Sequence, residues 1–283
     1  MKPFYIVDIG GTSIKFGISN ISAQEPLFQI QTPQNRTGII NTICEAINDF
    51  DTSFQSQNQI DTVMVSCPGL INEDGFVEKA LYIDLSGVDL KGVLEEKLCR
   101  KIKVFNDAKV QTIGRFVHKK ALLYMCIGTA VGGGFCSEQG LFSGGHGKSC
   151  EFGHILIKNC NNKCFCGREG CLDTIISGKA MLSQLGDDWW ERVSAPSVEE
   201  YIKYAAKALC ESLESLALLF DPDEICVCGN ICKVDLFRQQ AENLWKNNKW
   251  STARLDLRTD TWPFVYKGTS RLYESENLYI RHF

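Results

Sequence analysis

The sequence lacks the features that identify membrane, nucleic-acid-binding and secreted proteins. No apolar run reaches the roughly 18 residues that a membrane span needs. Its 30 Lys and Arg residues are outnumbered by 34 Asp and Glu, and the net charge of −4 gives no electrostatic footprint for nucleic acid. Residues 1–20 contain no basic start followed by an apolar run and a small-residue cleavage site, so no signal peptide is visible. We therefore expect a cytoplasmic protein with neither membrane nor nucleic acid as a partner.

Cysteine, by contrast, is abundant: the 283 residues include 14 of them. A disulfide framework is not expected, because such frameworks belong mainly to short secreted chains and this chain can bury a sizeable core. Several cysteines lie in apolar or periodic stretches, and we expect them to be reduced and buried as small hydrophobic residues. These are Cys44, Cys67, Cys99, Cys126, Cys136, Cys210, Cys226 and Cys228.

The segment 160–171 contains a different kind of cysteine, because it is polar, rich in glycine and non-periodic. Together with a preceding histidine it gives the spacing His-x9-Cys-x-Cys-x4-Cys, which matches the Cys₃His ligand set of a closed structural zinc site. The predicted ligands are His154, Cys164, Cys166 and Cys171. Glu151 precedes the histidine by one helical turn, and Asp173 follows the last cysteine by two residues. Two carboxylates beside a zinc loop indicate that the metal shapes a binding site.

The remaining pattern predicts an α/β protein with two similar lobes, 1–115 and 116–283, the second of which carries the zinc loop. Short apolar runs predict strands, and apolar residues at helical spacing predict helices. The strands are expected at 4–8, 14–18, 26–31, 61–66, 103–105, 122–127 and 224–228, and the helices at 38–50, 90–98 and 198–220. Beyond about residue 245 the sequence shows no clean period.

Two glycine turns at strand ends, 10–12 and 128–134, are suited to binding phosphate. Glycines let backbone N–H groups approach phosphate oxygens closely, and a threonine hydroxyl in each turn adds a donor. Either turn alone is equally typical of a plain hairpin, but a third strand also ends at a glycine, which favours a nucleotide in a cleft between the lobes. Asp8 is the expected ligand of a Mg²⁺ ion held largely through water. The predicted phosphate-binding residues are Gly10, Gly11, Thr12, Gly128, Thr129, Gly132 and Gly229.

Two other nucleotide-binding motifs are excluded. Gly147-Lys148-Ser149 ends like a P-loop, but Phe142 occupies the position of the required first glycine. A dinucleotide-binding Rossmann unit needs a helix directly after its glycine turn, whereas residues 14–18 are predicted to form a strand. An NAD site is therefore not expected.

Asp107 is the candidate catalyst, because it follows the strand 103–105 directly. A carboxylate at this place can accept the proton of a substrate hydroxyl as the hydroxyl attacks a γ-phosphate. The alternative is structural, since Asn and Asp are also the preferred N-cap residues of helices. From the spacing alone, the cap is the better interpretation of Asn106-Asp107-Ala108.

Taken in order, these motifs resemble the ROK family of sugar kinases. The matching segments are Asp8-Ile9-Gly10-Gly11-Thr12, Pro68-Gly69, Asn106-Asp107-Ala108, Gly128-Thr129 with Gly132-Gly133-Gly134, Glu151-x-Gly153-His154, and Cys164-x-Cys166-Gly167-x-x-Gly170-Cys171. The resemblance implies an actin-like, RNase-H-type fold with a cleft between two lobes. It also implies ATP and Mg²⁺, a structural Zn²⁺, a homodimer or homotetramer, and phosphorylation of a hexose or N-acetylhexosamine, usually at the 6-hydroxyl.

The resemblance also implies roles for individual residues. Asp107 becomes the general base, in place of a helix cap, and Asn106 binds a sugar hydroxyl. The remaining residues implied to bind the sugar are Gly69, Glu151, His154 and Asp173, with His154 also a zinc ligand. Asp173 stands where the family usually has a glutamate, and the last 30 residues do not resemble the usual closing helix.

Two other classes of function fit parts of the sequence. A catalytically weak or inactive sugar-binding or regulatory protein of the same family would account for the altered residues around the sugar. Such a protein has no need of the base Asp107. A zinc module for protein interaction would leave both phosphate turns unexplained. We therefore expect an ATP-dependent sugar kinase.

Overall fold

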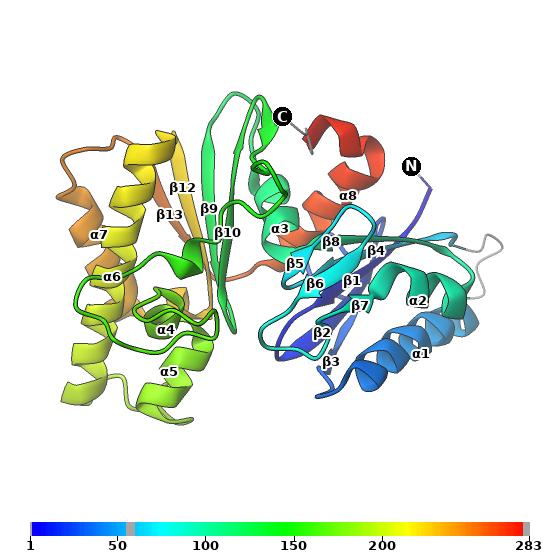
Figure 1. The fold of residues 1–283 in the computed structure, drawn as a ribbon, viewed down its shortest axis with the longest axis horizontal. Helices are drawn as coiled ribbons and strands as arrows, with labels where there is room; N and C mark the ends of the chain where they lie inside the picture. The colour runs from blue at the N-terminus through cyan, green and yellow to red at the C-terminus, as the bar shows by residue number, and fades with distance from the viewer. Residues whose placement is uncertain (1, 55–59, 280–283) are drawn as a thin grey trace. The chain divides into compact units, whose positions relative to one another are not determined.

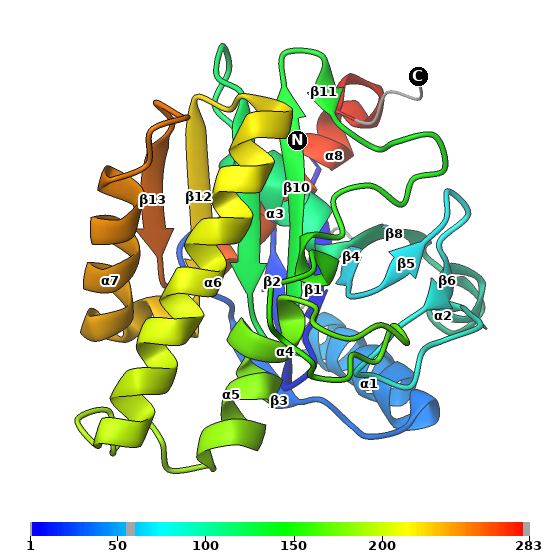
Figure 2. The same cartoon turned by 60° about the vertical axis from the view of Figure 1, so that its left-hand side comes forward.

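The computed structural model describes residues 2–54 and 60–279, and the chain divides into two compact units. Unit 1 contains the chain up to Arg115 together with Trp262–Tyr279, and unit 2 contains Phe116–Thr261. Each unit is a β-sheet with helices packed on it (Figure 1, Figure 2). The division differs from the predicted lobes in one respect, since residues 262–279 return to unit 1.

The main sheet of unit 1 combines parallel and antiparallel strands. Its order is β3 (Phe28–Gln31), β2 (Ser13–Ile18), β1 (Tyr5–Ile9), β4 (Thr62–Cys67) and β8 (Lys101–Asn106). β1, β4 and β8 are parallel, whereas β2 runs antiparallel to both of its neighbours. The other elements are the small sheet β5 (Leu70–Ile71), β6 (Phe76–Lys79) and β7 (Val88–Asp89), and the helices α1 (Arg36–Phe54), α2 (Leu90–Leu98), α3 (Asp107–Arg115) and α8 (Trp262–Tyr279).

Unit 2 repeats this topology. Its sheet has the order β11 (Gly140–Leu141), β10 (Val131–Ser137), β9 (Leu122–Ile127), β12 (Glu224–Gly229) and β13 (Arg254–Arg258). β9, β12 and β13 are parallel, and β10 runs antiparallel to its neighbours. The helices are α4 (Asp173–Ile176), α5 (Gly178–Leu185), α6 (Pro196–Phe220) and α7 (Asp235–Lys246), with 3-10 turns η1 (Phe152–His154) and η2 (Asn230–Lys233). The repeat agrees with the expected pair of similar α/β units.

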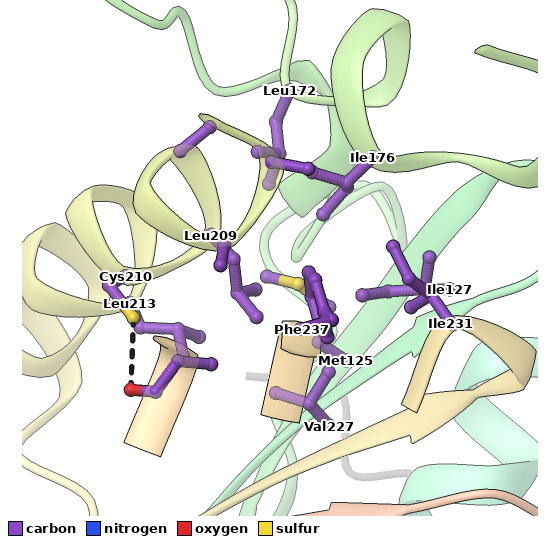
Figure 3. Close-up of a cluster of buried hydrophobic side chains, with 14 of the residues drawn as sticks. Met125, Ile127, Leu172, Ile176, Leu209, Cys210, Leu213, Val227, Ile231 and Phe237 are labelled. Carbon is purple, nitrogen blue, oxygen red and sulfur yellow. Dashed lines mark hydrogen bonds between the residues drawn. The ribbon is translucent and has the colours of Figure 1, made fainter. Parts of the chain in front are cut away.

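The core of unit 2 lies between its sheet and the long helix α6. Side chains at helical spacing on α6, including Leu209 and Leu213, meet Met125 of β9, Val227 of β12 and Phe237 of α7 (Figure 3). The helix begins with a proline in its first turn and ends at Phe220, and the capping residue Asp221 has a left-handed conformation. Pro222 follows, and proline cannot continue a helix.

The C-terminal helix α8 is one of several elements that the sequence analysis did not predict, together with α5, α7, β10 and β13. Its buried face consists of Trp262, Val265, Thr269 and Leu272, which do follow helical spacing. The pattern was obscured because one member is a threonine and because a glycine lies beside it on the same face. That glycine, Gly268, crosses α3 so closely that a Cβ would overlap the backbone of Val110.

The cysteines are reduced, as expected, and all 14 are free thiols within the described residues. Most of those predicted to be buried are buried, and Cys210 donates to the Ala241 carbonyl oxygen of α7 at 3.5 Å. Two predictions are corrected: Cys99 is exposed because it caps the end of α2, and Cys44 is only half-buried on α1. In the part of the chain that the structure describes, no helix is long and apolar enough to cross a membrane.

Candidate active site

The carboxyl ends of β1, β4 and β8 bring the predicted polar residues of unit 1 together. In the register of these parallel strands, Asp8 pairs with Ser66, and Cys67 pairs with Asn106. Asp107 follows Asn106 as the first residue of α3. Ligands of open α/β sheets bind at this edge, where parallel strands end. The edge therefore carries two carboxylates that were chosen from separate sequence motifs.

Asp8 is almost fully buried, with 6% of its surface exposed. Burial raises the pKa of its carboxyl group, whereas the nearby positive charge of Lys15 and a hydrogen bond from Ser66 lower it. The Ser66 hydroxyl donates to Asp8 Oδ1 at 2.8 Å, and Lys15 faces Asp8 across the β1–β2 register. Ser66 therefore orients the carboxylate and favours its ionised form.

The predicted phosphate turn of unit 1 is a tight hairpin between β1 and β2, formed by Gly10, Gly11 and Thr12. The Gly10 N–H donates to the Ser13 carbonyl at 2.9 Å, and the Thr32 hydroxyl donates to the Gly10 carbonyl at 2.6 Å. A strand follows the turn directly, as the sequence predicted, so the Rossmann arrangement is absent from this part of the described chain.

Asn106 is the helix cap that the sequence analysis considered. Its Oδ1 accepts the N–H of Lys109 at 3.0 Å, and its Nδ2 donates to the Gly69 carbonyl at 2.9 Å. The Gly69 backbone has φ of +117°, and a Cβ there would overlap the carbonyl oxygen of Lys79. Asn106 therefore joins the Pro68-Gly69 turn to the start of α3.

Asp107 is half-buried, and its Oδ1 accepts the N–H of Ala108 at 2.8 Å. Its carboxylate lies near Cys67, a buried thiol that the sequence analysis did not include in the site. Burial raises the pKa of Cys67 well above its ordinary value, and the charges of Asp107 and Asp8 raise it further. The thiol is thus neutral and near both carboxylates. The proximity of Cys67 to Asp8 and Asp107 follows from the pairing of β4 with β1 and β8, which the sequence does not show.

The predicted zinc ligands converge in unit 2. Their donor atoms lie within 4.8 Å of one another: His154, Cys164, Cys166 and Cys171. Cys166 Sγ is 3.6 Å from Cys171 Sγ, and His154 Nδ1 is 3.6 Å from Cys164 Sγ. Tetrahedral Zn²⁺ with Zn–S bonds of about 2.3 Å places two sulfurs about 3.8 Å apart. The donor set therefore fits zinc in both chemistry and spacing.

Arg168 connects the zinc loop to the histidine turn η1. Its guanidinium donates to the His154 carbonyl at 2.8 Å. Burial would raise the pKa of Cys166, but hydrogen bonds from the Arg168 backbone and side chain and from the neighbouring thiols lower it to about 7. The thiolate is the form that binds a metal. The loop therefore favours the metal-binding form of Cys166 near neutral pH.

The two carboxylates that flank the zinc motif have different surroundings. Glu151 is exposed and precedes η1 directly. Asp173 is 3% exposed at the start of α4, and its Oδ1 accepts the N–H of Val131 at 2.6 Å. Of this pair, the exposed Glu151 is therefore the better placed to meet a substrate.

The glycine turn predicted at 128–134 is shorter in the structure, because strand β10 already begins at Val131. The Gly128 N–H closes the turn by donating to the Ala130 carbonyl at 2.9 Å. Gly132 belongs to β10 and pairs with Cys126, so its backbone is not in the turn. The third glycine, Gly229, ends β12 with φ of +156°, and a Cβ there would overlap the carbonyl oxygen of Ile127.

Comparison with known proteins gives a consistent result. The sequence profile described as the ROK family matches residues 4–254. An N-acetylmannosamine kinase of Haemophilus influenzae is 26% identical over 244 residues, covering 80% of this chain and 79% of that protein. An N-acetylgalactosamine kinase of a Shewanella species is 28% identical over 260 residues, covering 82% and 83%.

Among solved structures, a ROK family glucokinase from Streptomyces griseus, in complex with glucose and AMPPNP, is similar with a TM-score of 0.79. The two chains are 22% identical, and the match covers 95% of this chain and 98% of that one. This likeness confirms the predicted α/β fold of the actin-like class.

Proposed function

Because the chain belongs to the ROK family, we propose that it is an ATP-dependent kinase that phosphorylates a hexose or N-acetylhexosamine at the 6-hydroxyl. The relatives named above are an N-acetylmannosamine kinase and an N-acetylgalactosamine kinase, which supports both the reaction and the class of acceptor. The observation that carries the proposal is the pair of carboxylates, Asp8 and Asp107, at the same edge of the unit 1 sheet.

Asp107 is the general base of the proposed reaction. It accepts the proton of the sugar hydroxyl as the oxygen attacks the γ-phosphorus, and the phosphorus–oxygen bond to ADP breaks. Because Asn106 already caps α3, the helix does not depend on Asp107 for its cap. Kinase catalysis consists mostly of positioning and charge neutralisation, and a half-buried carboxylate next to a rigid turn suits both.

In this proposal, the sugar is bound by residues near Asp107 in unit 1 and by residues of the zinc motif in unit 2. Gly69 and Asn106 are already joined by a hydrogen bond, so they form one preordered contact surface beside Asp107. Glu151, which precedes η1, supplies a carboxylate, and His154 at the end of η1 supplies a ring nitrogen. Asp173 remains a predicted sugar ligand, although one of its oxygens already accepts a backbone N–H.

The phosphates of ATP are bound by the turns 10–12 and 128–130 and by Gly229. Asp8 is the proposed ligand of Mg²⁺, which supplies charge neutralisation on the phosphate oxygens when bound. A single carboxylate fits this role because Mg²⁺ keeps most of its water and is bound by one or two carboxylates together with substrate phosphates. The zinc site is structural, since four protein donors leave no open position for a substrate.

Ser66→Ala is expected to move the acid limb of kcat/KM for MgATP to higher pH. The variant removes the hydrogen bond that lowers the Asp8 pKa, so burial raises that pKa further above its ordinary value. Ionised Asp8 is then lost at a higher pH as the solution is acidified, whereas activity well above the limb changes little. A pH–rate profile measures the shift. An unchanged acid limb would contradict the role of Asp8.

The proposed function is tested by measuring ADP release with a panel of hexoses and N-acetylhexosamines at saturating ATP and Mg²⁺. Turnover with at least one sugar is expected, and NMR of the product identifies the phosphorylated oxygen. Sugar binding without turnover on any member would instead favour the sugar-binding or regulatory alternative. The proposed homodimer or homotetramer is checked by light scattering, and the proposed cytoplasmic location by cell fractionation.

A further inference from the structure

Asp173 lies between the zinc loop and the phosphate turn of unit 2. It follows the zinc ligand Cys171 by two residues and is 3% exposed. Its Oδ1 accepts the N–H of Val131, the first residue after the turn Gly128–Ala130, at 2.6 Å. A buried carboxylate that accepts an N–H forms a short, charge-assisted hydrogen bond. Asp173 therefore fixes one end of the turn.

The first residues of α5 fix the other side of the same turn (Figure 1). The N–H groups of Gly178 and Lys179 donate to the carbonyls of Gly128, at 2.8 Å, and Thr129, at 3.3 Å. A Cβ on Gly178 would lie 3.0 Å from the Gly128 oxygen, so the approach favours glycine. The Lys179 ammonium lies 4.5 Å from the centroid of the Phe165 ring, which belongs to the zinc loop.

The histidine turn η1 contacts the same strand end. Gly153, next to the zinc ligand His154, packs so closely on Val131 that a Cβ would overlap the Val131 carbonyl oxygen. Segments from both ends of the zinc motif, η1 and α4, thus meet at a single residue of the β9–β10 hairpin, Val131. The order of the zinc site and the order of the turn are therefore linked.

We propose that Asp173 is a positioning residue through which the zinc site sets nucleotide affinity. The inference rests on the proposed function, because it takes the turn 128–130 to bind the phosphates of ATP. With its four ligands held, the chain at Cys171 is fixed, and Asp173 keeps the Val131 N–H in place. The backbone N–H groups of the turn 128–130 are then ordered before nucleotide binds. Preorganisation of this kind increases affinity because less conformational entropy is lost on binding.

The test measures ADP binding by isothermal titration calorimetry with Mg²⁺ present, using zinc-loaded wild type and three variants. Asp173→Ala is expected to raise the Kd for ADP about tenfold, as loss of one charge-assisted hydrogen bond predicts. Asp173→Asn keeps an acceptor oxygen and is expected to stay within about threefold of wild type. Tyr201→Phe is the matched control, because it removes a 3.0 Å hydrogen bond to Ile175 of α4 that does not reach the turn. Its ADP affinity is expected to equal that of wild type.

A sample from which a chelator has removed zinc completes a thermodynamic cycle, in which loss of zinc and Asp173→Ala are measured separately and together. Chelation is expected to weaken ADP binding by wild type but to have little further effect on Asp173→Ala, because coupled changes are not additive. The proposal is overturned by unchanged ADP affinity in Asp173→Ala, by equal losses in Asp173→Ala and Asp173→Asn, or by equal ADP affinity of zinc-free and zinc-loaded wild type. If circular dichroism shows that Asp173→Ala is unfolded, Asp173→Asn and the chelated wild type decide the question. Wild type that binds no ADP contradicts the proposed function as well.

Discussion

Asp107→Asn is expected to lower kcat by about 10²–10⁴-fold, the range that a general base contributes. Asparagine has nearly the same shape and retains an oxygen that can accept the Ala108 N–H, now held by Asp107 Oδ1 at 2.8 Å. The fold and the sugar affinity are therefore expected to persist, the latter within about tenfold of wild type. Initial rates of ADP release measure kcat, and calorimetry with the best sugar of the panel measures binding.

A matched control for this variant is Asp89→Asn. Asp89 also stands at the start of a helix of unit 1, where its Oδ1 accepts the Gly92 N–H at 2.9 Å. Asn and Asp are equally good N-caps, so this variant is expected to retain wild-type kcat. A loss of sugar affinity as large as the loss of kcat in Asp107→Asn would assign Asp107 to binding. A kcat near that of wild type would exclude it as the base.

Cys166→Ala is expected to lose zinc and sugar binding together. The substitution removes one of four donors from a closed site, and the remaining three cannot complete the tetrahedral shell of a structural zinc ion. His154 then loses its fixed orientation, and the η1 turn, which Glu151 directly precedes, is no longer held by the metal. Disturbing the surroundings of a metal site typically costs 10–100-fold in metal affinity or activity, so a loss of sugar affinity on the order of tenfold or more is expected.

Zinc content is measured by mass spectrometry of the purified protein, and sugar affinity by calorimetry. Cys160→Ala is the control, because Cys160 lies in the same loop but contacts Thr174 Oγ1 at 3.9 Å and is not among the converging donors. It is expected to keep both zinc and sugar. If Cys166→Ala binds sugar normally after losing its metal, the zinc loop does not organise the sugar site.

The strongest local patterns predicted their elements well. Leu90, Leu94 and Leu98 have helical spacing, and the predicted helix 90–98 is α2. The group of possible metal-binding residues was also predictable, because a metal requires particular donor types at short spacing, and both requirements are visible in a sequence. In the structure their donor atoms lie within 4.8 Å of one another, so the four residues could hold a metal ion.

The features of the site that could not be predicted from the sequence depend on contacts between distant segments. Ser66 became part of the site only because β4 pairs with β1 and brings its hydroxyl to Asp8, 58 residues away in the chain. The glycines at 132–134 were assigned to a turn because glycine usually marks one. In the structure, Gly133 instead leaves room in a strand for Phe152. Local propensity carries no information about such packing.

The return of α8 to unit 1 has a consequence for the order in which the protein is completed. Unit 1 is discontinuous in the chain: it is interrupted after Arg115 and resumes at Trp262. During synthesis, every residue of unit 2 up to Thr261 is made before the helix that crosses α3. The edge that holds Asp8 and Asp107 thus belongs to a unit that a nascent chain can complete only after all of Phe116–Thr261 has been made.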